Sequence, residues 1–211
     1  MKSHHPDATT LMEYSAGQLS QPHALAIQMH ITECGRCRSK VDTLECLGAV
    51  LLENQATTSM SALAFDNLLD RIDALDPEGK VDERDTRSPL EKLLGNDLNG
   101  LPWKKQLGDV SVLDISDLFP DQDEQVVLQR LCAGGKAPAH THRGNETSIV
   151  LQGAFVDGRG QFNQWDYVCL DGNDDHQPRA VGNEYCITLS ILSAPVKLTG
   201  RFTRFLNPLI R

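Results

Sequence analysis

Apolar residues in the first part of the chain recur at helical spacing, and we expect residues 7–54 to form helices. Within this range, one row of apolar side chains recurs at steps of three or four, which indicates a buried helical stripe. The row consists of Val41, Leu44, Leu47, Val50 and Leu51. A further helix is predicted at about 61–75, where leucine and isoleucine recur.

The composition changes at Asp76. Residues 76–89 read DPEGKVDERDTRSP, a mostly charged stretch in which Val81 is the one large apolar side chain. Such a segment lacks the apolar surface for a core and is typical of a flexible linker. A flexible tether leads us to expect that the parts on either side fold and bind independently.

After the linker, short β-branched or apolar runs alternate with turns rich in Gly and Asp. The runs lie at 126–128, 147–151, 165–170 and 185–192. Short strands at regular spacing predict a sandwich or barrel. We therefore predict an α+β protein with a helical domain at 1–75, a linker at 76–89 and a β-barrel domain at 90–211.

Charge and composition narrow the classes of partner. The formal net charge is −9, which repels phosphate backbones and anionic lipid, and aromatic residues make up only 5% of the chain. No segment approaches the roughly 18 consecutive apolar residues of a membrane span, and Met1–Pro6 lacks a signal-peptide core. We expect a cytoplasmic protein with no direct contact to nucleic acid or membrane, whose acidic surface suits a basic protein partner.

The six cysteines are expected to be reduced in such a compartment, where Cys close to His indicates metal binding. His30, Cys34 and Cys37 are spaced by four and three residues, so a helix or a tight helix corner brings them together. Thiolate and imidazole are ligands that zinc prefers. His5 or His4 is the natural fourth ligand. The remaining cysteines, namely Cys46, Cys132, Cys169 and Cys186, are expected to pack in the interior.

The segment His30-Ile31-Thr32-Glu33-Cys34-Gly35-Arg36-Cys37 resembles the HxxxCxxC signature of zinc-binding anti-sigma domains. The resemblance covers about residues 1–75 and implies a four-helix unit that clasps a sigma factor. It carries His30, Cys34 and Cys37 over as zinc ligands, and we favour His5 over His4 as the fourth.

A second set of residues lies in the β half. From Gly134 the chain reads Gly, five residues, His140, one residue, His142, three residues, Glu146, six residues, Gly153. Two histidines at i and i+2 of a strand face the same side, so both can reach one ion. Three imidazoles and a carboxylate, with His176 from a later strand, suit zinc or another divalent transition metal.

This pattern resembles the first cupin motif, and Gly172 to His176 resembles the second without its usual PxG. A helical zinc domain, a charged linker and a cupin together resemble the ChrR-type anti-sigma factors. That resemblance implies inhibition of one extracytoplasmic-function sigma factor per chain, with release under photo-oxidative stress by singlet oxygen or organic peroxides. In this picture the cupin half, which could also hold a small-molecule or oxidised ligand, is needed for the response.

A cupin metalloenzyme, such as a dioxygenase with a helical interaction domain, is the alternative. No clear acid or base stands beside the predicted ligands, so we assign no catalytic residue and favour a regulator.

Overall fold

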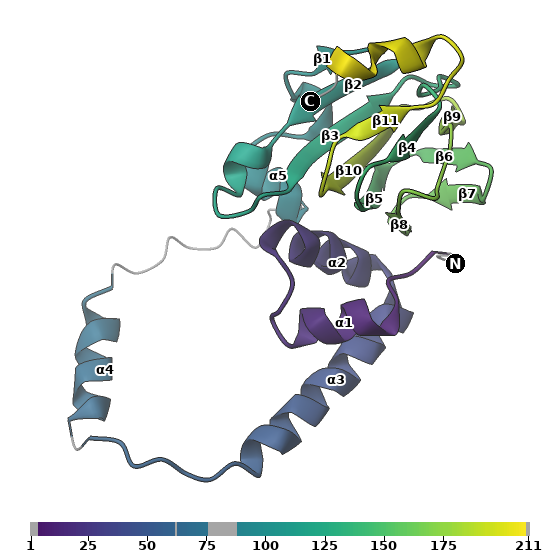
Figure 1. The fold of residues 1–211 in the computed structure, drawn as a ribbon. Helices are drawn as coiled ribbons and strands as arrows, with labels where there is room; N and C mark the ends of the chain where they lie inside the picture. The colour runs from purple at the N-terminus through teal and green to yellow at the C-terminus, as the bar shows by residue number, and fades with distance from the viewer. Residues whose placement is uncertain (1–3, 62, 76–87, 210–211) are drawn as a thin grey trace.

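The computed structural model describes residues 4–61, 63–75 and 88–209. Helices form the N-terminal part and β-strands the C-terminal part, so the predicted α+β fold is confirmed (Figure 1). Residues 76–87 of the predicted linker lie outside the described residues. Its last two residues, Ser88 and Pro89, are the N-cap and first residue of helix α5 (Pro89–Leu94).

Three helices form the N-terminal unit: α1 (Ala8–Ser15), α2 (Gln21–Glu33) and α3 (Gly35–Glu53). Asp7 caps α1, because its carboxylate accepts a hydrogen bond from the Thr10 amide at 2.7 Å. The three helices pack through a small set of fully buried side chains. These are Leu11, Ala26, Ile27, Met29 and Val41.

The predicted buried stripe on α3 is wrong beyond its first turns. Val41 is buried, but Leu47 is 55% exposed and Leu51 is 58% exposed. The reason is length: the 19 residues of α3 span about 28 Å, whereas α1 has 8 residues and spans about 12 Å. The second half of α3 therefore extends past its neighbours, and Cys46, expected in the interior, is exposed there.

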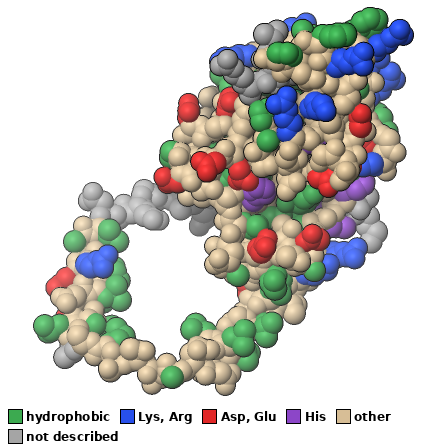
Figure 2. All heavy atoms as spheres, viewed as in Figure 1, with side chains coloured by type: hydrophobic (Ala, Val, Ile, Leu, Met, Phe, Trp, Pro, Cys, Tyr) green, Lys and Arg blue, Asp and Glu red, His purple; other side chains and the backbone are tan. Residues whose placement is uncertain are grey.

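The helix predicted at 61–75 is α4 (Ala64–Asp73), and it carries no buried residue. It stands apart from the other described helices instead of completing a four-helix unit (Figure 1). Hydrophobic side chains line the surfaces of both α4 and the far part of α3 (Figure 2).

The C-terminal part contains three antiparallel sheets that enclose a barrel interior. The largest has the order β1-β2-β3-β10-β5-β8, and the others pair β11 with β4 and arrange β7-β6-β9. The strands are β1 (Lys104–Lys105), β2 (Val110–Asp114), β3 (Gln125–Leu131), β4 (His140–His142), β5 (Glu146–Gln152), β6 (Ala154–Asp157), β7 (Gly160–Asn163), β8 (Tyr167–Leu170), β9 (Arg179–Val181), β10 (Cys186–Leu192) and β11 (Val196–Leu198). Short 3-10 helices lie at Leu98–Gly100 (η1), Ser116–Leu118 (η2) and Thr203–Leu209 (η3).

All four predicted strand runs overlap strands, namely β3, β5, β8 and β10, although Trp165 and Asp166 of the third run lie in the turn before β8. Of the three cysteines expected in the interior of this half, Cys186 is buried, whereas Cys132 and Cys169 are exposed. Cys132 follows β3 in a turn, and alternation along β8 turns Cys169 outward between two buried neighbours. None of the described helices is both long and apolar enough to cross a membrane.

The two halves pack directly on each other. Ala26, Ile27 and Met29 of α2 belong to the same buried cluster as Ile149 and Leu151 of β5. Helix α2 also contacts β8 and β10, so it covers one face of the large sheet. Within the described residues the halves therefore share a hydrophobic core, which the linker did not lead us to expect, while independent folding and binding of each half stays a prediction.

Candidate metal centres

The first candidate centre lies where the N-terminal arm meets the junction of α2 and α3. One nitrogen or sulfur atom from each of His5, His30, Cys34 and Cys37 lies within 4.8 Å of all the others. The His5 Nδ1 is 3.4 Å from the His30 Nε2 and 3.4 Å from each of the two Sγ atoms. The arm and the helix junction thus bring together the four residues that the sequence analysis selected.

These spacings fit a tetrahedral zinc ion. With bonds of about 2.0–2.3 Å, the ligands of a tetrahedral zinc stand about 3.3–3.8 Å apart. Cys34 ends α2 as its C-cap and immediately precedes α3, so the chain turns between the two thiols. Two thiols and two imidazoles in this arrangement form a closed structural site rather than an open catalytic one.

The His30 ring is oriented from behind by the other half of the protein. Its Nδ1 lies 2.7 Å from the backbone carbonyl oxygen of Trp165. A carbonyl oxygen only accepts, so Nδ1 carries the proton and Nε2 presents its lone pair to the site. His4, the alternative fourth ligand, lies elsewhere, with its Nδ1 3.4 Å from a carboxylate oxygen of buried Asp166.

Burial changes the protonation of the Cys37 thiol. Burial, followed by the neighbouring Cys34, raises the pKa of Cys37 to about 11. The metal-free thiol is therefore protonated at neutral pH, and binding of zinc releases that proton.

The second candidate centre lies inside the barrel, at β4 and the segment before β9. The Nε2 of His176 is 3.1 Å from the Nε2 of His140 and 3.4 Å from that of His142. His140 and His142 project from β4, and His176 reaches β4 through an isolated bridge to His140. Three imidazole nitrogens that converge in this way fit a divalent transition metal.

The rings of His140 and His176 are each held by their second nitrogen. The Nδ1 of His140 donates to the carbonyl oxygen of Pro138 at 2.8 Å, and the Nδ1 of His176 donates to the Asp157 carboxylate at 3.0 Å. These bonds fix the tautomer that leaves the Nε2 lone pair free. Burial lowers the pKa of both His142 and His176, which favours the neutral imidazole that a metal requires.

Glu146 lines the same chamber but lies to the side of the three Nε2 atoms. Its Oε1 accepts from Ser148 at 2.7 Å, and its Oε2 lies 3.1 Å from the Nδ1 of His142. Neither that Oε2 nor that Nδ1 has a hydrogen-bond partner among the described residues, although both are buried. A buried carboxylate with an unsatisfied oxygen fits a nearby cation. The ligand role of Glu146 stays a prediction.

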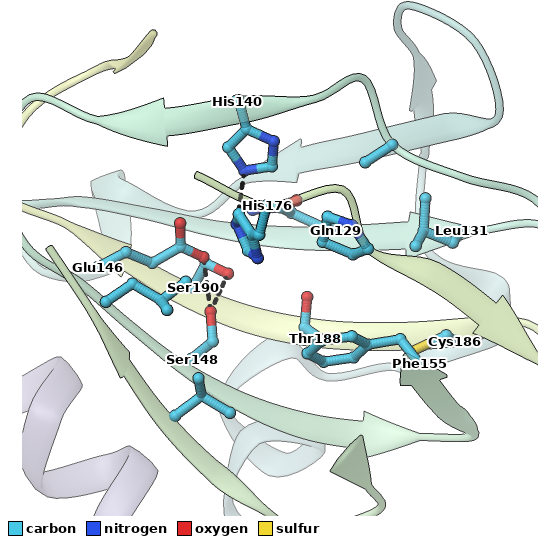
Figure 3. Close-up of a pocket in the computed structure, with 14 residues that line it drawn as sticks. Gln129, Leu131, His140, Glu146, Ser148, Phe155, His176, Cys186, Thr188 and Ser190 are labelled. Atoms are coloured by element: carbon cyan, nitrogen blue, oxygen red, sulfur yellow. Dashed lines mark hydrogen bonds between the residues drawn. The ribbon is translucent and has the colours of Figure 1, made fainter. Parts of the chain in front are cut away.

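The chamber around these residues is small (Figure 3). Its interior volume is about 40 Å³, and His140, His176 and Glu146 form one side of it. Such a space takes an ion with one or two water-sized ligands. Ser148 and Ser190 share a hydrogen bond of 2.6 Å below the carboxylate, so these two hydroxyls are partners of each other.

The residues that orient the ligands had no signal in the sequence. Neither Asp157 nor Trp165 belongs to a motif that would single it out for this role. Trp165 is the single non-glycine residue with positive φ, at 71°, in the described part of the chain. Such a conformation and a contact between residues 135 positions apart are tertiary properties.

Known proteins resemble this chain in both its helical half and its barrel half. Residues 94–194 match the family model of the ChrR cupin-like domain. The chain is 29% identical to the anti-sigma-E factor ChrR of Cereibacter sphaeroides over 213 residues, which is 99% of this chain and 98% of that protein. It is also similar to a chain in the crystal structure of Rhodobacter sphaeroides SigE in complex with the anti-sigma ChrR. That match has a TM-score of 0.77 and 27% identity, and covers 91% of this chain and 100% of the other.

Proposed function

We propose, from the premise that this chain belongs to the family of ChrR anti-sigma factors, that it binds and inhibits an extracytoplasmic-function sigma factor. In this proposal the protein acts by occupying a surface of its partner and not by catalysis. The helical half holds the sigma factor, and the cupin half governs release under photo-oxidative stress.

The observation that carries the proposal is the unpartnered apolar surface of the helical half. Leu68 is 50% exposed, Leu69 is 42% exposed and Ile72 is 52% exposed, all on α4. The far part of α3 adds Leu47 and Leu51. Amphipathic helices that expose such faces are typical of segments that lie in a groove of a protein partner.

The electrostatics suit the same role. The net charge of −9 disfavours nucleic acid and favours a basic protein surface. Aspartates flank the apolar residues of α4, at positions 66, 70 and 73. An apolar contact with an acidic rim therefore matches a partner that presents an apolar groove bordered by basic side chains.

The proposed release step is supported by the chemistry of the metal centres. Thiolates of the first centre are groups that singlet oxygen and peroxides oxidise, and loss of a ligand weakens a zinc site that stabilises the fold. The second centre lies in the half that contacts α2 directly. A change there can reach the helical half through packed side chains.

A reconstituted transcription assay with the cognate sigma factor tests the proposal. The change of Leu68→Asp together with Leu69→Asp should weaken inhibition strongly, because interface energy concentrates in buried apolar anchors. The control is Asn67→Asp with Arg71→Gln, which alters the charge of α4 equally but keeps its apolar face. Unchanged inhibition by the leucine variant, or equal loss in the control, would contradict the proposed contact.

A further inference from the structure

We propose that the barrel of this protein binds an aliphatic chain with a carboxylate head, the chain lying in an apolar cavity beside the three-histidine centre. The proposal rests on the metal assigned to that centre and not on the identity of the sigma factor. The apolar cavity is the space between β2, β3 and β11 beneath η3.

The apolar cavity has a volume of about 520 Å³, within the range of about 300–1,000 Å³ that small-molecule sites occupy. Its walls are mainly aliphatic. The aliphatic residues in these walls include Leu107, Val110, Val112, Val127, Leu192 and Leu198. Polar side chains, among them Lys104 and Gln106 near β1, are exposed and lie toward solvent.

The apolar cavity and the metal chamber meet at shared residues. Gln129, Ala137 and His140 line both spaces. His140 is also one of the three histidines whose Nε2 atoms converge. We therefore place the inner end of a molecule that fills the apolar cavity beside the His140 ring, next to the amide of Gln129.

The lining selects the chemical class of the occupant. No Phe, Tyr or Trp side chain is among the described residues that line the apolar cavity, so it lacks the usual platform for stacking a sugar or a base. Aliphatic walls favour an alkyl chain, and each buried methylene should raise affinity about fourfold. At the inner end, a divalent metal with neutral imidazole ligands favours an anionic oxygen donor. A fatty carboxylate satisfies both ends.

The test uses the full-length protein with Co²⁺ in the barrel and octanoate, hexanoate, butyrate and gluconate as probes. Calorimetry gives the affinities, and the cobalt absorption spectrum reports the head group. We expect affinity to rise about fourfold per methylene from butyrate to octanoate, and hexanoate to bind much more tightly than gluconate. We also expect each bound carboxylate to change the cobalt spectrum.

Two variants on η3 separate the cavity from its surroundings. Leu206 lines the apolar cavity, whereas its neighbour Phe205 is 71% exposed and does not. Leu206→Trp should fill the mouth and weaken octanoate at least tenfold with little effect on butyrate, and Phe205→Trp should bind as the wild type.

The affinities and the cobalt spectra together can contradict each part of the proposal. Equal affinity across the chain-length series, or gluconate binding as well as hexanoate, would overturn the assignment of an aliphatic chain. Tight binding with an unchanged cobalt spectrum would overturn the placement of the head. The series on the wild-type protein remains decisive even if Leu206→Trp does not fold. Failure here leaves inhibition of the sigma factor untouched, since that is measured separately.

Discussion

The Nδ1 of His30 donates a hydrogen bond to the backbone carbonyl oxygen of Trp165 at 2.7 Å, so the barrel holds a predicted ligand of the first candidate centre. Trp165 adopts φ of 71°. This conformation costs a non-glycine residue about 1–3 kcal/mol and persists only where the surrounding structure holds it in place. Its own amide donates to the Val150 carbonyl at 2.7 Å, which ties the turn to β5.

The same part of the barrel also reaches the second centre. Asp157, at the end of β6, holds His176, and β6 pairs with β7 just before the turn that contains Trp165. The N-terminal arm adds a contact, because the Tyr167 amide donates to the His4 carbonyl at 3.2 Å. Residues 154–167 thus form a physical connection between the two metal centres.

Removal of zinc should loosen this connection. Without zinc, His30 and the N-terminal arm lose their anchor, so the Tyr167 amide that bonds to His4 should exchange with solvent faster. Hydrogen exchange with and without a chelator measures this, with the Leu189 amide in the middle of β10 as an internal control. Equal protection of the Tyr167 amide in both states would show that the centres are not coupled along this route.

Loss of the two thiols should abolish the first centre. In the Cys34→Ser/Cys37→Ser protein we expect loss of bound zinc and of much helical structure, since small metal sites contribute directly to folding. Elemental analysis and circular dichroism measure both effects. The matched control is Cys46→Ser/Cys132→Ser, which changes two exposed cysteines outside the centre and should keep full zinc content. Full zinc in the first variant would disprove the assignment.

The residues that meet in both candidate centres could largely be predicted because their spacing follows from local geometry. An i, i+2 pair on a strand and an i, i+4 step at a helix end place side chains together whatever surrounds them, as His140 with His142 and His30 with Cys34 demonstrate. His5 had to be chosen from two neighbours, and only the folded arm separates it from His4.

The expectations that differ from the structure concern tertiary packing, that is, which surfaces are covered by other parts of the chain. The apolar row on α3 has the same helical pattern whether or not another element covers it, so the pattern could not distinguish a core from an exposed docking face. The charged linker indicated independence, yet α2 packs on β5 through Ile27 and Met29. A tether permits separation but does not decide whether the tethered surfaces are complementary.

Disruption of the barrel centre should affect release more than inhibition. His140→Ala/Glu146→Ala removes one of the converging imidazoles and the predicted carboxylate ligand without changing residues 1–75. Cells with this variant should keep the sigma factor repressed in the dark and fail to release it under singlet oxygen. Thr141→Ala serves as the control, because the Thr141 hydroxyl donates a hydrogen bond to the Gly172 carbonyl oxygen and does not belong to the three-histidine centre.

Two other outcomes with the His140→Ala/Glu146→Ala variant would contradict this prediction. Loss of basal repression by a soluble variant would mean that the barrel helps to hold the helical half in its inhibitory form. A normal response would mean that the metal in the barrel has no part in sensing.

Asp157 should control metal affinity in the barrel without being a ligand. Burial acts to raise the pKa of Asp157, but hydrogen bonds from Arg159 and His176 hold that pKa below its ordinary value. The carboxylate is therefore ionised at neutral pH and fixes the His176 ring so that its Nε2 faces His140. Asp157→Ala removes this support and should weaken metal binding about 10–100-fold, as loss of such orienting partners does at other sites.

Competition with a chromogenic chelator measures that affinity, and Asp157→Asn provides the graded comparison. An asparagine keeps an acceptor oxygen for the His176 Nδ1 but removes the charge, so its affinity should lie between those of the wild type and Asp157→Ala. A destabilised fold alone would lower thermal stability equally in the presence and absence of metal. A positioning role instead predicts that stabilisation by added metal shrinks in the order wild type, Asp157→Asn, Asp157→Ala. The reason is that, at one metal concentration, a ligand stabilises the native state less as its dissociation constant rises. Metal affinity unchanged in Asp157→Ala would show that the His176 ring is fixed by its backbone bridge to His140 and not by the carboxylate.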